Sequence, residues 1–186
     1  MPTPENIAKV YDFSNVFEVA LKTLFTSGPT QVKAFTSQMI PTTGDASQDA
    51  QLQQQGYEII DFIKDRPRVE IFFTPGAGQE RHEAQNIGGF DTSVETSWKG
   101  QFRLDCTTDA DIRQHSAFVT MVRYVMHTQL YNGINGKILQ NHYIHQFAKD
   151  SGTTPMIKTE EGLFQTTLLF NIDFSIQEGA WALLVA

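Results

Sequence analysis

The residues best suited to chemistry in this sequence are the single cysteine, Cys106, and five histidines. Cys106 and His115 could in principle form a nucleophile and its general base. However, Cys106 belongs to the apolar face of an expected strand, where a thiol is more often a small core residue. His115 lies within the apolar stripe of an expected helix, which favours a hydrogen-bonded histidine between helix and sheet. We therefore predict no catalytic dyad.

A second pair of histidines, His142 and His145, occurs in the stretch "HYIH". On a strand, residues three apart point to opposite faces, so the two imidazoles could not bind one ion together. One cysteine also cannot supply a thiolate zinc site or a disulfide within the chain. We therefore predict no metal site.

Sequence motifs of common enzymes are also absent. The stretch "GAGQER" at 76–81 contains two glycines but lacks the spacing of phosphate-binding loops. No G-x-S-x-G, H-E-x-x-H or D-x-D-x-D-G pattern occurs, which removes the main hydrolase, zincin and calcium-site signatures. We therefore expect no enzyme, no catalytic residue and no cofactor.

The composition favours one domain over residues 1–186, with 40% hydrophobic residues to build its core. The net charge is -7, so the sequence does not indicate a broad cationic surface for nucleic acid or anionic lipid. The N-terminus lacks a basic region followed by an apolar run, and no window approaches the roughly 20 apolar residues of a membrane span. We expect a soluble protein made in a cytoplasm.

The stretch "EGLFQTTLLFNIDFSIQ" at 161–177 is the clearest structural signal. Most apolar residues fall on even positions and most polar residues on odd positions, which is the period of two of a strand with one buried face. Three shorter segments have strand character: "RPRVEIFF" at 66–73, "WKGQFRLDC" at 98–106 and "HYIHQFAKD" at 142–150. Two-faced strands indicate an antiparallel or mixed four-stranded sheet.

Two helices are expected to cover one face of this sheet. The first begins with Ser14 as N-cap and ends before Gly28. The second begins with Thr108 as N-cap and runs to about residue 130. Its predicted buried stripe consists of Ile112, His115, Val119, Val122 and Met126. The predicted fold class is therefore α+β, with helices packed on one face of the sheet.

Two long polar segments interrupt these elements. The Gln-rich tract at 41–56 cannot supply core residues, and we expect a projecting loop or a partly ordered arm. The segment 74–97 has no clear periodicity and is predicted to be a second long loop.

The polar face of the sheet carries mixed charge, which is a feature of a subunit that builds a larger assembly. The alternative is a face that is simply solvated. The candidate assembly residues are Arg68, Glu70, Arg103, Asn171 and Asp173.

The order of elements resembles that of the tail terminator, or tail completion, proteins of long-tailed bacteriophages. The resemblance rests on "RPRVEIFFTPG", "WKGQFRLDC", the helix "DIRQHSAFVTMVRYVMH" and the return through "EGLFQTTLLFNIDFSIQEGAW". It covers about residues 66–181 and the first helix. The resemblance implies a small α+β structural protein that forms a hexameric ring, ends the tail tube and faces the head connector or stopper protein.

The same resemblance implies the partners: further copies of the chain, the tail tube protein and the connector, with DNA passing through without sequence-specific binding. The 41–56 and 74–97 segments depart from the smaller members of the family. Two alternatives stay open, namely a head-tail joining protein of another neck ring, and a small soluble enzyme or ligand-binding α+β domain.

Overall fold

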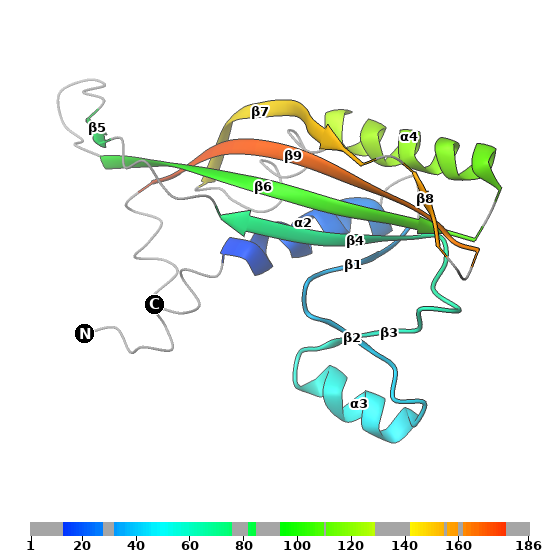
Figure 1. Cartoon of the computed structure of the whole chain (residues 1–186). Helices are drawn as coiled ribbons and strands as arrows, with labels where there is room; N and C mark the ends of the chain where they lie inside the picture. The colour runs from blue at the N-terminus through cyan, green and yellow to red at the C-terminus, as the bar shows by residue number, and fades with distance from the viewer. Residues whose placement is uncertain are drawn as a thin grey trace.

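The computed structural model of the chain describes residues 13–27, 32–75, 82–84, 94–109, 111–128, 142–154, 156–159 and 162–177. The fold is α+β, as predicted (Figure 1). Its helices and strands are, in order, α2 (Phe13–Ser27), β1 (Lys33–Phe35), β2 (Met39–Pro41), α3 (Ala46–Gln54), β3 (Glu58–Ile60), β4 (Arg68–Pro75), β5 (His82–Ala84), β6 (Val94–Thr108), α4 (Ile112–Thr128), β7 (His142–Thr153), β8 (Ile157–Lys158) and β9 (Phe164–Gln177).

The main sheet is mixed and has the strand order β1-β4-β6-β9-β7, with β5 pairing to β6 and β8 pairing to β9. Strands β6 and β9 form its long antiparallel centre, in register from Glu95 opposite Gln177 to Thr108 opposite Phe164. The four predicted strands correspond to β4, β6, β7 and β9. The structure adds β1, which pairs with β4 in parallel, and the short strands β5 and β8.

Helices α2 and α4 pack on one face of this sheet, which we call the inner face. Aromatic rings form its centre: the Phe17 and Phe73 centroids are 4.7 Å apart, and those of Phe73 and Phe102 are 5.0 Å apart. On β9 the even positions Leu168, Phe170 and Ile172 are at most 1% exposed, which confirms the predicted alternation over this part of the strand. These residues and the apolar stripes of both helices make one core.

Helix α4 begins later than the sequence pattern predicted. Thr108 is the last residue of β6, and the cap is instead Asp111, whose carboxylate accepts a hydrogen bond from the Gln114 amide at 2.9 Å. Ile112 is 55% exposed, so its predicted place in the buried stripe was wrong. The later start rotates the first turn so that His115 is its first buried residue. Helix α2 begins at Phe13, so Ser14 is inside its first turn.

A separate unit, residues 37–67, projects from the sheet below β1 (Figure 1). We call it the arm. Strands β2 and β3 pair in parallel, and α3 crosses over between them. The predicted loop at 41–56 therefore contains a helix, because Asp45 caps α3 and its Ala, Gln and Leu residues have high helix propensity. The segment also projects from the sheet, as predicted (Figure 1). The predicted loop at 74–97 was wrong at its described positions, because residues 82–84 form β5 and residues 94–97 belong to β6, which pairs with the full length of β9. Residues 76–81 and 85–93 lie outside the described residues.

Candidate assembly face

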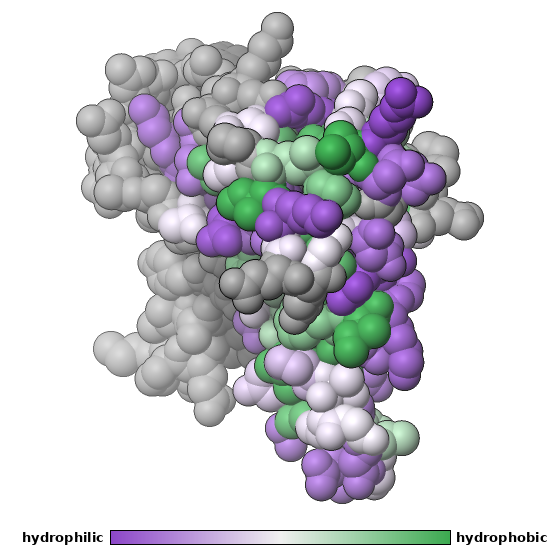
Figure 2. Space-filling view, turned by 45° about the vertical axis from the view of Figure 1, so that its right-hand side comes forward, coloured by the Kyte–Doolittle hydropathy of each residue, from purple (hydrophilic) through white to green (hydrophobic). Residues whose placement is uncertain are grey.

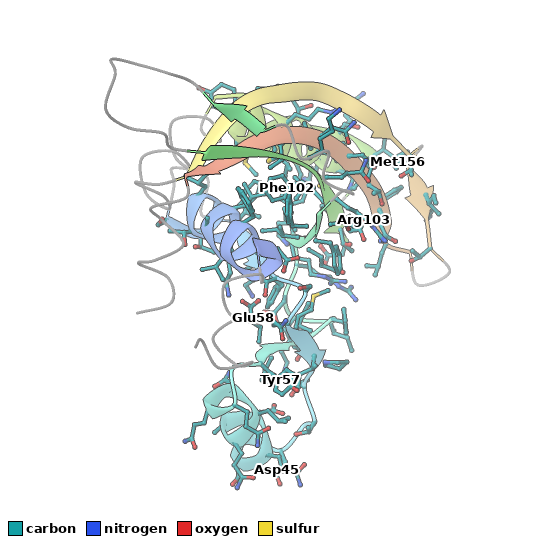
Figure 3. The ribbon with its side chains drawn as sticks, turned by 90° about the vertical axis from the view of Figure 1, so that its left-hand side faces the viewer. Asp45, Tyr57, Glu58, Phe102, Arg103 and Met156 are labelled. Carbon is teal, nitrogen blue, oxygen red and sulfur yellow. The ribbon has the colours of Figure 1, made fainter. Side chains whose placement is uncertain are left out.

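The side of the sheet opposite the helices, which we call the outer face, is where the sequence placed its candidate residues. Residues paired across neighbouring strands share a face, so the register assigns Glu70, Asp105 and Thr167 to one row. A second row contains Phe72, Arg103 and Leu169. Figure 3 shows the alternation directly: Phe102 points toward the helices and Arg103 points away from them. The five candidate residues occupy this one face by register: Arg68, Glu70, Arg103, Asn171 and Asp173.

Asp105 is the centre of a hydrogen-bonded network on the outer face. Its carboxylate accepts from Arg103 Nη2 at 2.6 Å, from Arg103 Nε at 3.2 Å and from Thr167 Oγ1 at 2.6 Å. The Arg103 guanidinium also lies 5.3 Å from the Phe72 ring centroid. The hydrogen bonds with Asp105 raise the pKa of Arg103 above its usual value, so this side chain stays charged. The network holds the arginine in a fixed orientation.

Exposure differs sharply between the two partners of this ion pair. The Arg103 side chain is 54% exposed, whereas that of Asp105 is 3% exposed. The carboxylate therefore lies beneath the guanidinium, and the surface itself presents the cation. Next to it, Gln101 Nε2 donates to Asn171 Oδ1 at 2.9 Å, and Asn171 is exposed. The register places Asp173 opposite the exposed Lys99.

Arg68 and Glu70 are on the outer face but are buried within this single copy. Arg68 Nε donates to Glu70 Oε1 at 2.7 Å, and its Nη1 donates to the Phe62 carbonyl at 3.1 Å. The Phe62 ring covers the guanidinium at 4.9 Å. The turn between β3 and β4 thus covers this end of the face, and Arg68 links β4 to the arm. Among the four candidates whose side chains are described, Arg103 and Asn171 are exposed, and the side chain of Asp173 lies outside the described residues.

A pair of carboxylates at the base of the arm was missed by sequence reasoning. Glu18 of α2 is 1% exposed and accepts from the amides of Phe73 at 2.7 Å and Ser37 at 2.8 Å, and from the Ser37 hydroxyl at 2.6 Å. Glu58 of β3 accepts from the Thr36 amide at 2.8 Å and from Lys22 Nζ at 2.7 Å. The polar residues Glu18 and Lys22, four apart in an apolar helix, were the available signal.

These contacts connect one side of α2 to Ser37, where the chain enters the arm, and to Glu58 of β3. Glu18 and Lys22 lie one turn apart, so one helix surface reaches the entry of the arm and its return strand. In Figure 3, Glu58 lies between α2 and the rest of the arm, while Asp45 marks the tip. The arm is therefore a fixed projection.

The tip of the arm is ordered by its own polar side chains. Asp45 Oδ1 accepts from the Ser47 amide at 2.8 Å and caps α3. Asp49 accepts from the Thr42 hydroxyl and from the amide and hydroxyl of Thr43. These hydrogen bonds lower the pKa of Asp49, so its carboxylate stays ionised at neutral pH. None of the residues of α3 is buried.

The groups considered for catalysis occupy the core. Cys106 is fully buried, and burial raises the pKa of its thiol, which disfavours the nucleophilic thiolate. His115 is 1% exposed, and each of its ring nitrogens lies 2.9 Å from a threonine hydroxyl, Thr108 on one side and Thr166 on the other. The imidazole therefore joins α4 to β6 and β9, as expected for a histidine between helix and sheet.

The described ranges contain neither a cluster of metal ligands nor a membrane-spanning helix. No group of three or more potential metal-binding side chains occurs among them. A β-bulge at His145 interrupts the alternation of side chains on β7. The prediction that His142 and His145 point to opposite faces assumed a regular strand, which β7 is not at this position. No helix in the described part of the chain is long and apolar enough to span a membrane.

No protein-family model matches the sequence, and a search of curated protein sequences returned no match.

Proposed function

We propose that this chain is a structural subunit of a bacteriophage virion that assembles with further copies into a ring. By the resemblance described above, the ring is hexameric, ends the tail tube and joins it to the head connector. The ring is built in the host cytoplasm and needs no cofactor. DNA passes through it without sequence-specific contacts.

The observation that carries this proposal is the organisation of the outer face. A solvated surface needs no fixed geometry, because water satisfies its polar groups. Here Arg103 is held by two hydrogen bonds to a buried carboxylate and by an aromatic ring. A side chain that is ordered before binding loses less conformational entropy on association. The face is therefore suited to a protein partner.

The composition of this face also agrees with a protein partner. Phe72 and Leu169 are half-buried beside Arg103, and Ile157 is 58% exposed on the adjoining strand β8. Figure 2 shows hydrophobic side chains interleaved with hydrophilic ones on the end of the sheet that carries β8. Apolar residues together with arginine are characteristic of interface centres.

The test introduces a charge on the outer face without disturbing the core. In Asn171→Glu the new carboxylate can still accept a hydrogen bond from Gln101, and exposed substitutions usually change stability by less than about 0.5 kcal/mol. We expect a normal melting temperature and loss of assembly, measured by sedimentation velocity. Ala117→Glu, an exposed site on α4, is the matched control and should assemble as the wild type does. Normal assembly of Asn171→Glu would show that the outer face is only solvated.

A further inference from the structure

We propose that the arm of one copy docks, through α3 at its tip, on the outer face of the next copy. This inference rests on the proposed ring and names the element that occupies the face. The occupant is a second copy of the same chain, and the contact runs from the arm of each subunit to the sheet of its neighbour.

The charge of the arm is the first argument. From residue 34 to residue 63 the sequence contains no lysine or arginine, although the chain has 14 of these residues. The same segment contains four carboxylates. Glu58 pairs with Lys22 at its base, and Asp61 pairs with Lys64 in the turn before β4. Asp45 and Asp49 remain at the tip, where they bond to neutral groups of the arm.

The charge of the outer face is opposite in the groups that it exposes. Lys99 and Arg103 are exposed, whereas the carboxylates of Asp105 and Glu70 are 3% and 12% exposed. Among the outer-face side chains that the structure describes, the exposed charged groups are therefore cations, beside amide groups, while the register also places Asp173 on this face, opposite Lys99. An acidic helix rich in glutamine supplies the acceptors that such a surface binds, and the part of the arm from residue 37 to residue 63 contains no lysine or arginine to oppose it.

The rigidity of the arm is the second argument. Its base is fixed by Glu18 and Glu58, and its tip is fixed by the Asp45 cap and the Asp49 hydrogen bonds. A nine-residue helix is shorter than the roughly 12–15 residues that isolated helices need in water. The chain thus stabilises a helix locally although the helix contributes no residue to the core. A preordered helix lowers the entropy lost when it binds.

The direction of the arm indicates which outer face its tip can bind, that of its own copy or that of a neighbouring copy. Figures 1 and 3 show the tip pointing away from the sheet of the same copy. The tip and the outer face are therefore two different surfaces of one subunit. A contact between two different surfaces is heterologous, and its repetition generates a closed ring when the rotation between copies closes on itself.

The experiment separates the two halves of this contact. In an armless variant, residues 43–55 are replaced by a Gly-Ser linker of about eight residues, which spans roughly 16 Å. Because α3 has no buried residue, the body should fold normally. A second arm variant, Ala50→Lys with Gln53→Lys, keeps the helix and reverses its charge. The face variant is Asn171→Glu.

We expect the armless variant and Asn171→Glu to be monomeric when each is alone. Mixed together, they should form a 1:1 dimer, because the intact arm of the face variant can bind the intact face of the armless variant. The variant with Ala50→Lys and Gln53→Lys in α3 should weaken assembly at least about tenfold in dissociation constant. Adding Asn171→Glu to this variant should recover part of the lost affinity.

The outcomes distinguish this inference from the proposed ring. A wild-type ring together with an armless variant that still forms rings would overturn the arm contact and leave the ring intact. Armless monomers together with Asn171→Glu rings would overturn it too, by placing the arm on another surface. A wild-type chain that never associates would remove the proposed ring itself.

Discussion

At the scale of single residues, burial keeps the two reactive side chains, Cys106 and His115, away from solvent. Cys106 lies on the inner face, opposite Thr166, and His115 bonds to that same threonine. This arrangement gives both residues a structural role. The sequence predicted that role from the apolar pattern around each of them.

The accessibility of Cys106 gives the simplest test of this interpretation. The chain has one cysteine, so a thiol reagent reports on this site alone. We expect no reaction with Ellman's reagent in the native protein, because burial raises the pKa of the thiol and excludes the reagent. One equivalent should react in guanidinium chloride. Rapid reaction of the native protein would favour the alternative of a small soluble enzyme.

The titration of His115 makes a second prediction. Burial lowers the pKa of His115 below its usual value of 6.5. Between these two pKa values the unfolded chain binds more protons than the folded one, so the free energy of unfolding falls as the pH decreases below about 6.5. We expect the melting temperature of the wild type to decrease from pH 7.5 to pH 5.5 more than that of His115→Gln. Equal decreases would assign the pH dependence to other groups.

At the scale of elements, the outer and inner faces of β6 and β9 were predictable, whereas the helix and the two strands of the arm were not. A period of two is local and strong, so the sequence identified β4, β6 and β9. Strands β1, β2 and β3 have three residues each, too few to show a period. Both parallel pairs join segments distant in the chain, and no local pattern specifies such pairing.

Helix α3 was missed for a different reason. Sequence reasoning looked for an apolar stripe, and α3 buries none of its residues. Its signals were the capping Asp45 and a run of good helix formers. On the outer face, the alternation located the candidate residues, but the burial of Arg68 and Glu70 depends on the turn at 61–67, which no spacing reveals.

The cap of α3 yields a prediction at this scale. Asp45→Ala removes the side chain that accepts from the Ser47 and Gln48 amides, which typically costs about 1 kcal/mol of helix stability. Because α3 contributes nothing to the core, the loss should stay local. We expect faster hydrogen exchange at 46–54 and an unchanged melting temperature. A lower melting temperature would show that α3 supports the body of the protein.

At the scale of the whole molecule, the arm and the sheet behave as one unit because Glu18 connects them. Its carboxylate accepts hydrogen bonds from β4 and from the first residue of the arm, Ser37. It also covers the Phe73 amide on the part of β4 that extends beyond β1, which protects an edge of the sheet from pairing with other chains.

Replacing Glu18 by glutamine tests this connection. The new amide group keeps the size of the side chain but can accept at only one oxygen, which leaves a buried donor unsatisfied. We expect a loss of about 1–3 kcal/mol in the free energy of unfolding, measured by urea titration. Hydrogen exchange at 37–41 should increase at the same time. Unchanged exchange there would show that the arm is fixed by other contacts.

The most direct test of the central claim is the solution mass of the wild-type chain, measured by light scattering over a wide range of concentrations. Negatively stained images of the same samples show the shape of the assembly. We predict a concentration-dependent increase from the 21.0 kDa subunit to a closed ring of six copies with a central opening. A mass that stays at one subunit at every concentration, or open filaments of unlimited length, would contradict the account.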